Sequence, residues 1–413
     1  MSGLAILVMS VLLACGTDPN STQTAAPTRT TLPAPTAERP ASNGQRLRPG
    51  IHTVDEVDDL PLPTSGYELY AVGEPHGERE ARLLTLGYLK TLHETARVRD
   101  ILLELSPAYE REINAYVLGL EDTVSPDWSF GADMIVGVRI FNDTLPDSEK
   151  VRVRLVDLDL NFADVYAHLK SLLEELGAGT TSVDLPSLSE FSSWDEAEML
   201  ALIDQVAEAS QDRGGFTREL TTIKDSIRFC MAWQQFGSGE LSESELIEQM
   251  SIREKRIAEN TRYLLARPDG APVLALYGGW HIQRHPAVIV AWGAFSQSST
   301  MDSNPPWVQR LAESGVSIYS VLAEGISGEA QIADSFPQRI EREPHQMRFS
   351  DGTTLGDIFD STPEHSILYV DLRLGMNGTL RLGDEFQDVP AGEIYDGIIL
   401  FREASPVEYK KYP

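Results

Sequence analysis

The sequence is poor in cysteine: Cys15 and Cys230 are its only two among 413 residues. If Cys15 carries a lipid, Cys230 has no partner within the chain, which excludes an intramolecular disulfide and a cysteine metal cluster. Cys230 lies in an apolar, helical-looking stretch, where a free cysteine is usually a small buried side chain. The sequence therefore predicts no function for Cys230.

Basic residues are also scarce. The chain has 34 lysines and arginines against 63 aspartates and glutamates, which makes a formal net charge of −29. Such a charge repels the phosphates of nucleic acids and the headgroups of anionic lipids. We therefore expect no nucleic acid partner, and no contact with a membrane beyond a lipid anchor.

Two common catalytic motifs are missing. No Gly-x-Ser-x-Gly sequence occurs, which argues against a serine hydrolase of the α/β-hydrolase type. No Walker-type phosphate-binding loop occurs either, so nucleotide hydrolysis has no support. A small-molecule substrate and a different set of catalytic residues are expected.

The N-terminus predicts where the protein works. The apolar run Leu4–Ala14 is too short to span a bilayer, and it ends in Leu-Leu-Ala-Cys-Gly, which resembles the lipobox of bacterial lipoproteins. Residues 1–15 are thus predicted to be a lipoprotein signal peptide, with Cys15 as the lipidated first residue of the mature chain. Residues 16–50, rich in Ser, Thr, Pro and Ala, predict a disordered tether. The expected location is the bacterial cell envelope, outside the cytoplasmic membrane.

Residues 51–413 predict a single α/β domain. Short runs of Val, Ile and Leu alternate with longer helical patterns, which is typical of a mostly parallel sheet flanked by helices. A largely helical stretch at about 187–266 is expected to be an insertion over the carboxyl edge of the sheet. Two late apolar runs, Ile367–Leu372 and Gly397–Phe401, are expected to be antiparallel strands at the sheet edge.

The sequence Gly-Glu-Pro-His-Gly at residues 73–77 lies between a strand pattern and a helical pattern. In an open α/β sheet, the loops after the carboxyl ends of the strands form the ligand crevice, so Glu74 and His76 are placed for chemistry. Alternatively, Glu74 could be a helix-start carboxylate and His76 a polar turn residue. The two flanking glycines favour a functional site, because they suggest a sharp turn or a close approach to a ligand.

Polar residues also end three other predicted strands. Glu104 interrupts an apolar run, where a carboxylate is costly unless it is paired or used. Asp157 and Asp159 follow the next strand and are interpreted as loop or helix-start residues. His281 follows a Gly-Gly turn at the end of a fourth strand and is a further candidate. We expect Glu104 and His281 to lie on the same edge as the Gly-Glu-Pro-His-Gly turn.

Several motifs together carry a family resemblance. They are, in chain order, Gly73–Gly77 with Glu80, Leu103-Glu104, Arg253–Asn260, Gly279–His281, Tyr369–Arg373 and Tyr395–Phe401. These segments resemble the motifs of the erythromycin esterase family and its relatives. The single residue between Glu74 and His76 is similar to the Gly-Glu-x-His sequence of the ChaN-type haem-binding lipoproteins, which belong to the same superfamily, as do the TraB and Tiki proteins.

The resemblance implies hydrolysis of an ester or lactone without a cofactor. His76 would act as the general base on a water molecule, with Glu74 orienting the imidazole. Glu104 and His281 would complete the catalytic set. The sequence alone names no substrate, because a shared fold does not define a substrate.

Two arginines are predicted to bind the substrate. Arg253, in the helical Arg-x-x-x-x-Ala-x-Asn stretch, could stabilise a developing oxyanion, while Asn260 would fix that helix. A solvated position on the helix face is the alternative for Arg253. Arg82 is the corresponding candidate in the first helix.

Two other functions stay open for the same crevice. In one, the protein binds haem or iron, and His76 or His281 is an axial ligand. In the other, Glu74, His76, Glu104 and His281 bind a divalent ion, because mixed oxygen and imidazole ligands suit Mn, Fe or Zn.

Overall fold

The computed structural model describes residues 48–123, 131–177, 183–210, 216–284, 304–331, 338–342, 344, 346–382 and 389–407. The predicted signal peptide, Cys15 and nearly all of the predicted tether lie outside these residues. The lipidation of Cys15 and the disorder of the tether therefore stay predictions. None of the helices in the described ranges is long and apolar enough to cross a membrane.

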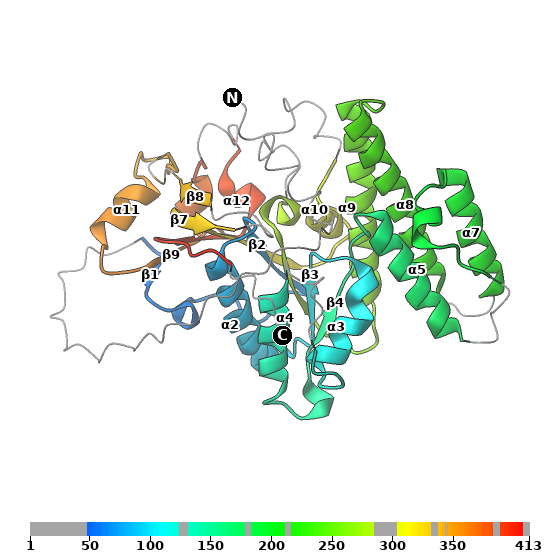
Figure 1. Ribbon diagram of the computed structural model, residues 1–413. Helices are drawn as coiled ribbons and strands as arrows, with labels where there is room; N and C mark the ends of the chain where they lie inside the picture. Colours follow the sequence, from blue (N-terminus) through cyan, green and yellow to red (C-terminus); the bar gives the residue numbers. More distant parts are fainter. Residues whose placement is uncertain are drawn as a thin grey trace, which may run out of the picture.

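A mixed sheet, eight-stranded over the described residues, forms the centre of the molecule (Figure 1). Across the sheet its strands are β1 (Ile51–Val54), β9 (Ile367–Asp371), β10 (Gly397–Phe401), β6 (Ile318–Gly325), β2 (Leu69–Glu74), β5 (Val273–Gly278), β3 (Asp100–Leu103) and β4 (Arg152–Arg154). The strands from β10 to β4 run parallel to one another, and β9 is antiparallel to both of its neighbours. The predicted α/β class and the late extension of the sheet edge are confirmed, although β10 joins the sheet in parallel with β6.

Helices cover both faces of the sheet. One face packs against α2 (Arg79–Ala96), α3 (Glu110–Val117) and α4 (Ala132–Asn142). The other face packs against α9 (Glu243–Leu265), α10 (Trp307–Glu313), α11 (Leu355–Ser361) and α12 (Ala391–Ile394). Every residue of the central strands β2 and β5 is buried as a result, which explains why their sequences are apolar without alternation.

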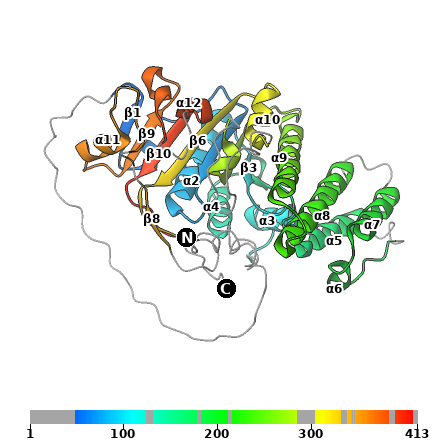
Figure 2. The same cartoon turned by 90° about the horizontal axis from the view of Figure 1, so that it is seen from above.

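A group of helices projects from the β4 side of the sheet, far from β1 (Figure 2). It consists of α5 (Phe162–Leu176), α6 (Leu188–Phe191), α7 (Glu196–Ala209) and α8 (Phe216–Ser238), which share an apolar core of their own. Helix α9 packs against α8 and connects this helical lobe to the sheet. The sequence predicts helices over most of this region, and the structure extends the lobe back to α5.

A short antiparallel pair, β7 (Ser327–Ala330) and β8 (Gln338–Glu341), follows β6. The segment after this pair lies next to the start of α2, because the carbonyl of Gly77 accepts backbone hydrogen bonds from the amides of Gln331 and Val407. The segment after β6 therefore supports the turn that carries His76.

Candidate functional site

The turn after β2 places Glu74 and His76 at the carboxyl end of the sheet. Glu74 is the last residue of β2, and its Oε1 lies 3.5 Å from His76 Nδ1. Its other oxygen, Oε2, accepts a 3.2 Å hydrogen bond from Arg82 Nε of helix α2. Burial opposes ionisation of Glu74, but Arg82 and His76 hold the pKa of this carboxyl below its usual value. Glu74 is therefore an ionised partner for the imidazole.

Arg82 is buried beneath this pair and does not face a crevice. Its Nη1 donates a 2.6 Å hydrogen bond to Asp133 Oδ1 of helix α4. The guanidinium thus connects Glu74 to the helix layer behind it. Arg82 is bonded to Glu74 and Asp133 within the protein, and its contact with a substrate stays a prediction.

The two glycines of the turn are required by close packing within the protein. A Cβ on Gly73 would lie 2.8 Å from the Ile282 side chain, and Gly77 has φ +95° with Gln331 backbone atoms 2.5 Å from a Cβ. Both contacts exclude a side chain. The close approach that the sequence suggested is therefore made by neighbouring segments of this chain.

Glu104, just after β3, is the centre of the cluster. Its Oε1 accepts a 2.8 Å hydrogen bond from Arg253 Nη2 and lies 3.3 Å from His281 Nε2. Its Oε2 accepts a 2.8 Å hydrogen bond from the Gly278 amide and lies 3.8 Å from His76 Nε2. Burial opposes its ionisation, yet His281, His76 and Arg253 hold the pKa of Glu104 well below its usual value. Glu104 is therefore a carboxylate that connects the ends of several strands.

His281 lies in a short 3-10 turn, Gly279–Ile282, directly after β5. Its Nδ1 is 2.8 Å from Glu254 Oε1 of helix α9, and its Nε2 faces Glu104. Burial alone would lower the pKa of His281, but Glu254 and Glu104 outweigh it and raise the value to about 10. His281 is thus an imidazolium at neutral pH, and it cannot accept a further proton there.

Arg253 reaches the cluster from helix α9. It binds Asp157 through two hydrogen bonds, Nε to Oδ1 at 2.8 Å and Nη2 to Oδ2 at 2.6 Å. Burial disfavours the charge, but Asp157 and Glu104 raise the pKa of Arg253 well above its usual value. These donors are bonded to protein carboxylates, and the predicted contact of Arg253 with an oxyanion stays a prediction. Asn260 donates to the carbonyl of Val156 and fixes the same helix.

Three solved structures share this architecture over most of the chain. A mutant of the erythromycin esterase EreC in its open conformation matches with a TM-score of 0.61 at 14% identity, over 87% of this chain and 98% of that one. The chain has the erythromycin esterase fold. A succinoglycan biosynthesis protein matches with a TM-score of 0.63 at 13% identity, over 87% of this chain and 96% of that one. A Bacillus cereus protein matches with a TM-score of 0.55 at 15% identity, over 84% of this chain and 91% of that one.

These likenesses establish the fold and leave the activity to the residues of this chain. No family model matches the chain, and no curated protein sequence matches it. Haem-bound ChaN of Campylobacter jejuni aligns with a TM-score of 0.27, which is too low to support haem binding here. The expected resemblance to erythromycin esterases is thus confirmed as a shared fold.

Within the erythromycin esterase fold, the residues that the sequence selected come together at one edge of the sheet. Glu74, His76, Glu104, Arg253 and His281 form one connected network, while their catalytic roles stay predictions. Three further acidic residues belong to this network and were not predicted as site residues, namely Asp133, Asp157 and Glu254.

Each of these three acidic residues escaped prediction for a different reason. Asp157 lies beyond the end of β4, and its partner Arg253 is distant in the sequence, so its position was predicted but its ion pair was not. Glu254 stands next to Arg253 within the family-like stretch, so the motif itself was an available signal. No sequence motif marks Asp133, because its contact with Arg82 depends on how α4 packs against α2.

The network does not fit a metal centre. In the described ranges, no group of three or more His, Cys, Asp or Glu side chains has a geometry suited to a metal ion. Both ring nitrogens of His281 face carboxylates, so a haem or a metal ion at His281 would have to displace Glu104 or Glu254. The guanidinium of Arg253 beside them adds a repelling charge.

Proposed function

We propose that this protein is a hydrolase that cleaves an ester or a lactone, with His76 as the general base. The observation that carries the proposal is the accessibility of His76 within the network. Its side chain is 13% exposed and that of Glu104 is 12% exposed, against 4% for Glu74, 9% for Arg253 and 2% for His281. A substrate can therefore reach the imidazole beside Glu104, while the more buried groups hold the ring in place.

The protonation states support the choice of His76 over its neighbours. Glu104 has a strongly lowered pKa and is a weak base, and the raised pKa of His281 keeps that ring protonated. Glu74, ionised and 3.5 Å from Nδ1, orients the ring and stabilises an imidazolium there. The proton-accepting atom is then Nε2 of His76.

In the proposed reaction, His76 Nε2 takes a proton from a water molecule as the water oxygen bonds to the acyl carbon. The tetrahedral intermediate then collapses, the bond from the acyl carbon to the leaving oxygen breaks, and the imidazolium returns its proton to that oxygen. The products are a carboxylic acid and an alcohol, or one hydroxy acid from a lactone. Arg82, Arg253 and Glu104 hold the two partners of this step and do not exchange protons.

The test is a comparison of His76→Ala with the parent on a broad panel of esters and lactones. The loss of a general base should lower kcat by ~10²–10⁴-fold without a change in the folded state. His52→Ala is the matched control, because His52 is exposed on β1 at the far edge of the sheet and should keep full activity. Equal activity of His76→Ala and the parent would falsify the assignment.

The proposal includes the location of the enzyme. We infer that it is anchored by a lipid on Cys15 and acts outside the cytoplasmic membrane, since a lipobox-like sequence precedes Cys15 and a polar stretch follows it. Mass spectrometry of the mature N-terminus should find a diacylated Cys15. Recovery of an unmodified, unprocessed N-terminus from the cell that naturally makes the protein would contradict this part alone.

A further inference from the structure

Asp133 lies near the start of helix α4 and reaches the His76 network through Arg82. Its Oδ1 accepts a 2.6 Å hydrogen bond from Nη1 of Arg82. The other two nitrogens of this guanidinium face Glu74, with Nε 3.2 Å from Oε2 and Nη2 3.5 Å from Oε1. The same Oε1 lies 3.5 Å from Nδ1 of His76. A continuous chain of contacts therefore runs from Asp133 to the imidazole.

The charges along this chain alternate in sign. Arg82 and Glu74 are almost fully buried, whereas Asp133 keeps 27% of its side chain exposed. Without Asp133, the charges of Arg82 and Glu74 would cancel beside the ring. With Asp133 present, the guanidinium and its two carboxylates carry a net charge of −1. This net negative charge favours a proton on the imidazole of His76.

The packing of α4 against α2 keeps Asp133 next to Arg82. One turn after Asp133, Gly137 lets the two helices approach closely, because a Cβ there would lie 2.8 Å from one methyl carbon of Leu86 and closer still to the other. Leu86 in turn lies one turn after Arg82 on α2. The two contacts are thus in register along both helices. The helix pair therefore fixes the carboxylate of Asp133 on the guanidinium.

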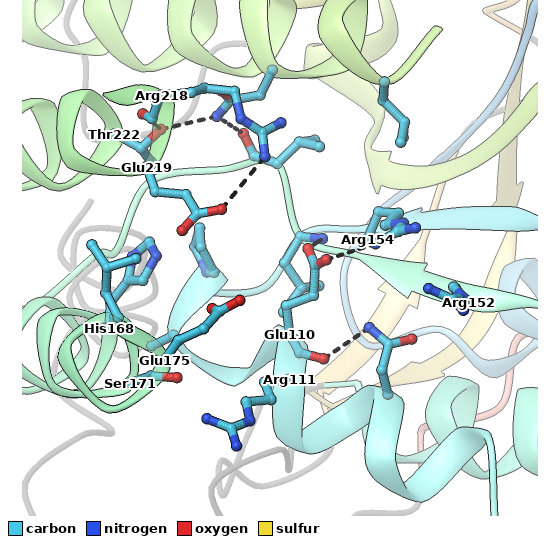
Figure 3. A pocket seen from close by; sticks show the side chains of 18 of the residues that line it. Glu110, Arg111, Arg152, Arg154, His168, Ser171, Glu175, Arg218, Glu219 and Thr222 are labelled. Carbon is cyan, nitrogen blue, oxygen red and sulfur yellow. Dashed lines mark hydrogen bonds and ion pairs between the residues drawn. The ribbon is translucent and has the colours of Figure 1, made fainter. Parts of the chain in front are cut away.

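A cavity of about 890 Å³ along β4 lies apart from these contacts. Residues of α3, β4, α5, α8 and α9 line it (Figure 3), and Asp133, Arg82 and Glu74 are not among them. Arginines and glutamates of its wall pair with one another, as Arg154 does with Glu110 at 3.1 Å. A ligand in that cavity would not contact the pair of Asp133 with Arg82. The role of this pair is therefore sought in the His76 network.

We propose that Asp133 is a positioning residue for the general base, and that it acts on the imidazole of His76 through Arg82 and Glu74. The inference rests on the proposed role of His76 and extends it to a residue of helix α4. Arg82 alone would direct all of its donors to Glu74 and draw that carboxylate away from the ring. Because Asp133 takes one of these donors, Glu74 keeps an oxygen for His76 and stabilises the imidazolium that forms in the reaction.

Other charged groups of the network also act on the ring. Glu104 Oε2 lies 3.8 Å from Nε2 of His76, and both Arg253 and His281 lie next to Glu104. All three reach His76 from β3, α9 and the turn after β5, on the side away from Arg82. A substitution of Asp133 should leave these contacts in place, so it tests the contribution of α4 alone.

Asp133→Asn keeps the shape of the side chain and removes its charge. The pH at the midpoint of the His76 ring titration, followed by NMR, should fall by roughly half a unit at low salt, because the ring loses the net negative charge beside it. The acidic limb of the pH–rate profile for ester hydrolysis should move to lower pH by the same amount. On the plateau of that profile, kcat should fall roughly three- to tenfold with KM unchanged, since the base is weaker and less firmly held.

Two variants separate this effect from net charge and from a loss of packing. Asp143→Asn removes the same charge just after α4, where Asp143 is exposed and pairs with Arg139, and it should behave like the parent. Asp133→Glu retains the carboxylate and should keep most of the activity. In a Glu74→Gln background, Asp133→Asn should have little further effect on kcat, because Asp133 acts through Glu74.

The inference is overturned if Asp133→Asn titrates and turns over like Asp143→Asn. It is also overturned if the losses from Asp133→Asn and Glu74→Gln are fully additive. Either result would leave the proposed hydrolase intact as long as His76→Ala is inactive. Full activity of His76→Ala would overturn the proposed function itself, and the ring titration would still show whether Asp133 acts on His76.

Discussion

Arg253 on helix α9 and Asp157 just beyond strand β4 form a buried, two-pronged ion pair with hydrogen bonds of 2.8 and 2.6 Å. The pair connects helix α9 to the carboxyl edge of the sheet. Arg253 also donates to Glu104, so the same guanidinium connects α9 to the His76 network. The stability of the fold and the geometry of the site therefore depend on one side chain.

Removal of this arginine should destabilise the protein strongly. In Arg253→Ala, Asp157 and Glu104 lose a buried counter-charge, which typically costs about 3–5 kcal/mol in the free energy of unfolding. Denaturant unfolding measures this loss. Lys255→Ala on the same helix is the control, because Lys255 is 65% exposed and its pair with Glu259 is worth less than about 1 kcal/mol. Similar losses in both variants would contradict the role given to Arg253.

The stability should fall in alkaline solution because of His281. Its pKa is about 10 in the folded protein and about 6.5 when unfolded, so the folded state holds an extra proton between these values. The stabilisation by the imidazolium is complete below pH 6.5 and is lost as the pH rises towards 10. In Glu254→Gln, the pKa of His281 should fall. The loss of stability should then occur over a narrower range of pH.

An NMR titration of the His281 ring and unfolding curves from pH 6 to 10 measure these effects. Glu248→Gln is the matched control, because Glu248 is an exposed glutamate on the same helix and should leave the titration unchanged. If Glu254→Gln and the parent titrated alike, the contact of Glu254 with His281 would have no electrostatic effect.

Glu78 should also make the protein less stable as the pH rises, but over a lower pH range than His281. Burial raises the pKa of this carboxyl to about 7, although Arg342 and the Gly325 amide oppose the shift. The folded state therefore favours the protonated form, and the free energy of unfolding falls as the pH rises from 4.5 to 7. The loss in the free energy of unfolding is at most about 3.4 kcal/mol.

Glu78→Gln should remove this pH dependence, since glutamine keeps the shape but does not ionise. Unfolding curves at intervals between pH 4.5 and 8 provide the measurement. Glu94→Gln is the control, because Glu94 is exposed on α2, the helix that Glu78 precedes. In this variant the free energy of unfolding should depend on pH as it does in the parent. If the free energy of unfolding of Glu78→Gln kept the pH dependence of the parent, Glu78 would not be the source of that dependence.

Gly278→Ala should impair activity more than stability. A Cβ at this position would lie 3.2 Å from His76 Nε2 and 3.4 Å from Glu104 Oε2. The backbone of Gly278 has φ −52°, which alanine also adopts, so the fold should tolerate the substitution. The methyl group would displace the imidazole by a few tenths of an ångström, and we expect a fall in kcat of roughly 10–100-fold. Gly237→Ala in helix α8, where a Cβ meets nothing, should keep full activity. If Gly278→Ala had the kcat of the parent, close packing of the His76 ring against Gly278 would not matter for activity.

Much of the site was predictable from the order of strands and polar residues. Parallel strands end at the same edge of a sheet, so the polar groups that end β2, β3 and β5 had to meet there. This local rule selected Glu74, His76, Glu104 and His281. It could not supply their protonation states, which depend on carboxylates and guanidiniums from other elements.

The sequence by itself determined the alternation of strands and helices, the acidic character of the chain and the edge on which the candidate residues gather. Only the tertiary structure decided that Arg82 supports Glu74, that Arg253 binds Asp157, and that His281 is held between two glutamates. Periodicity and strand order are local properties of a chain. These ion pairs join side chains from different helices, strands and turns, so they depend on how the elements pack, which no local pattern encodes.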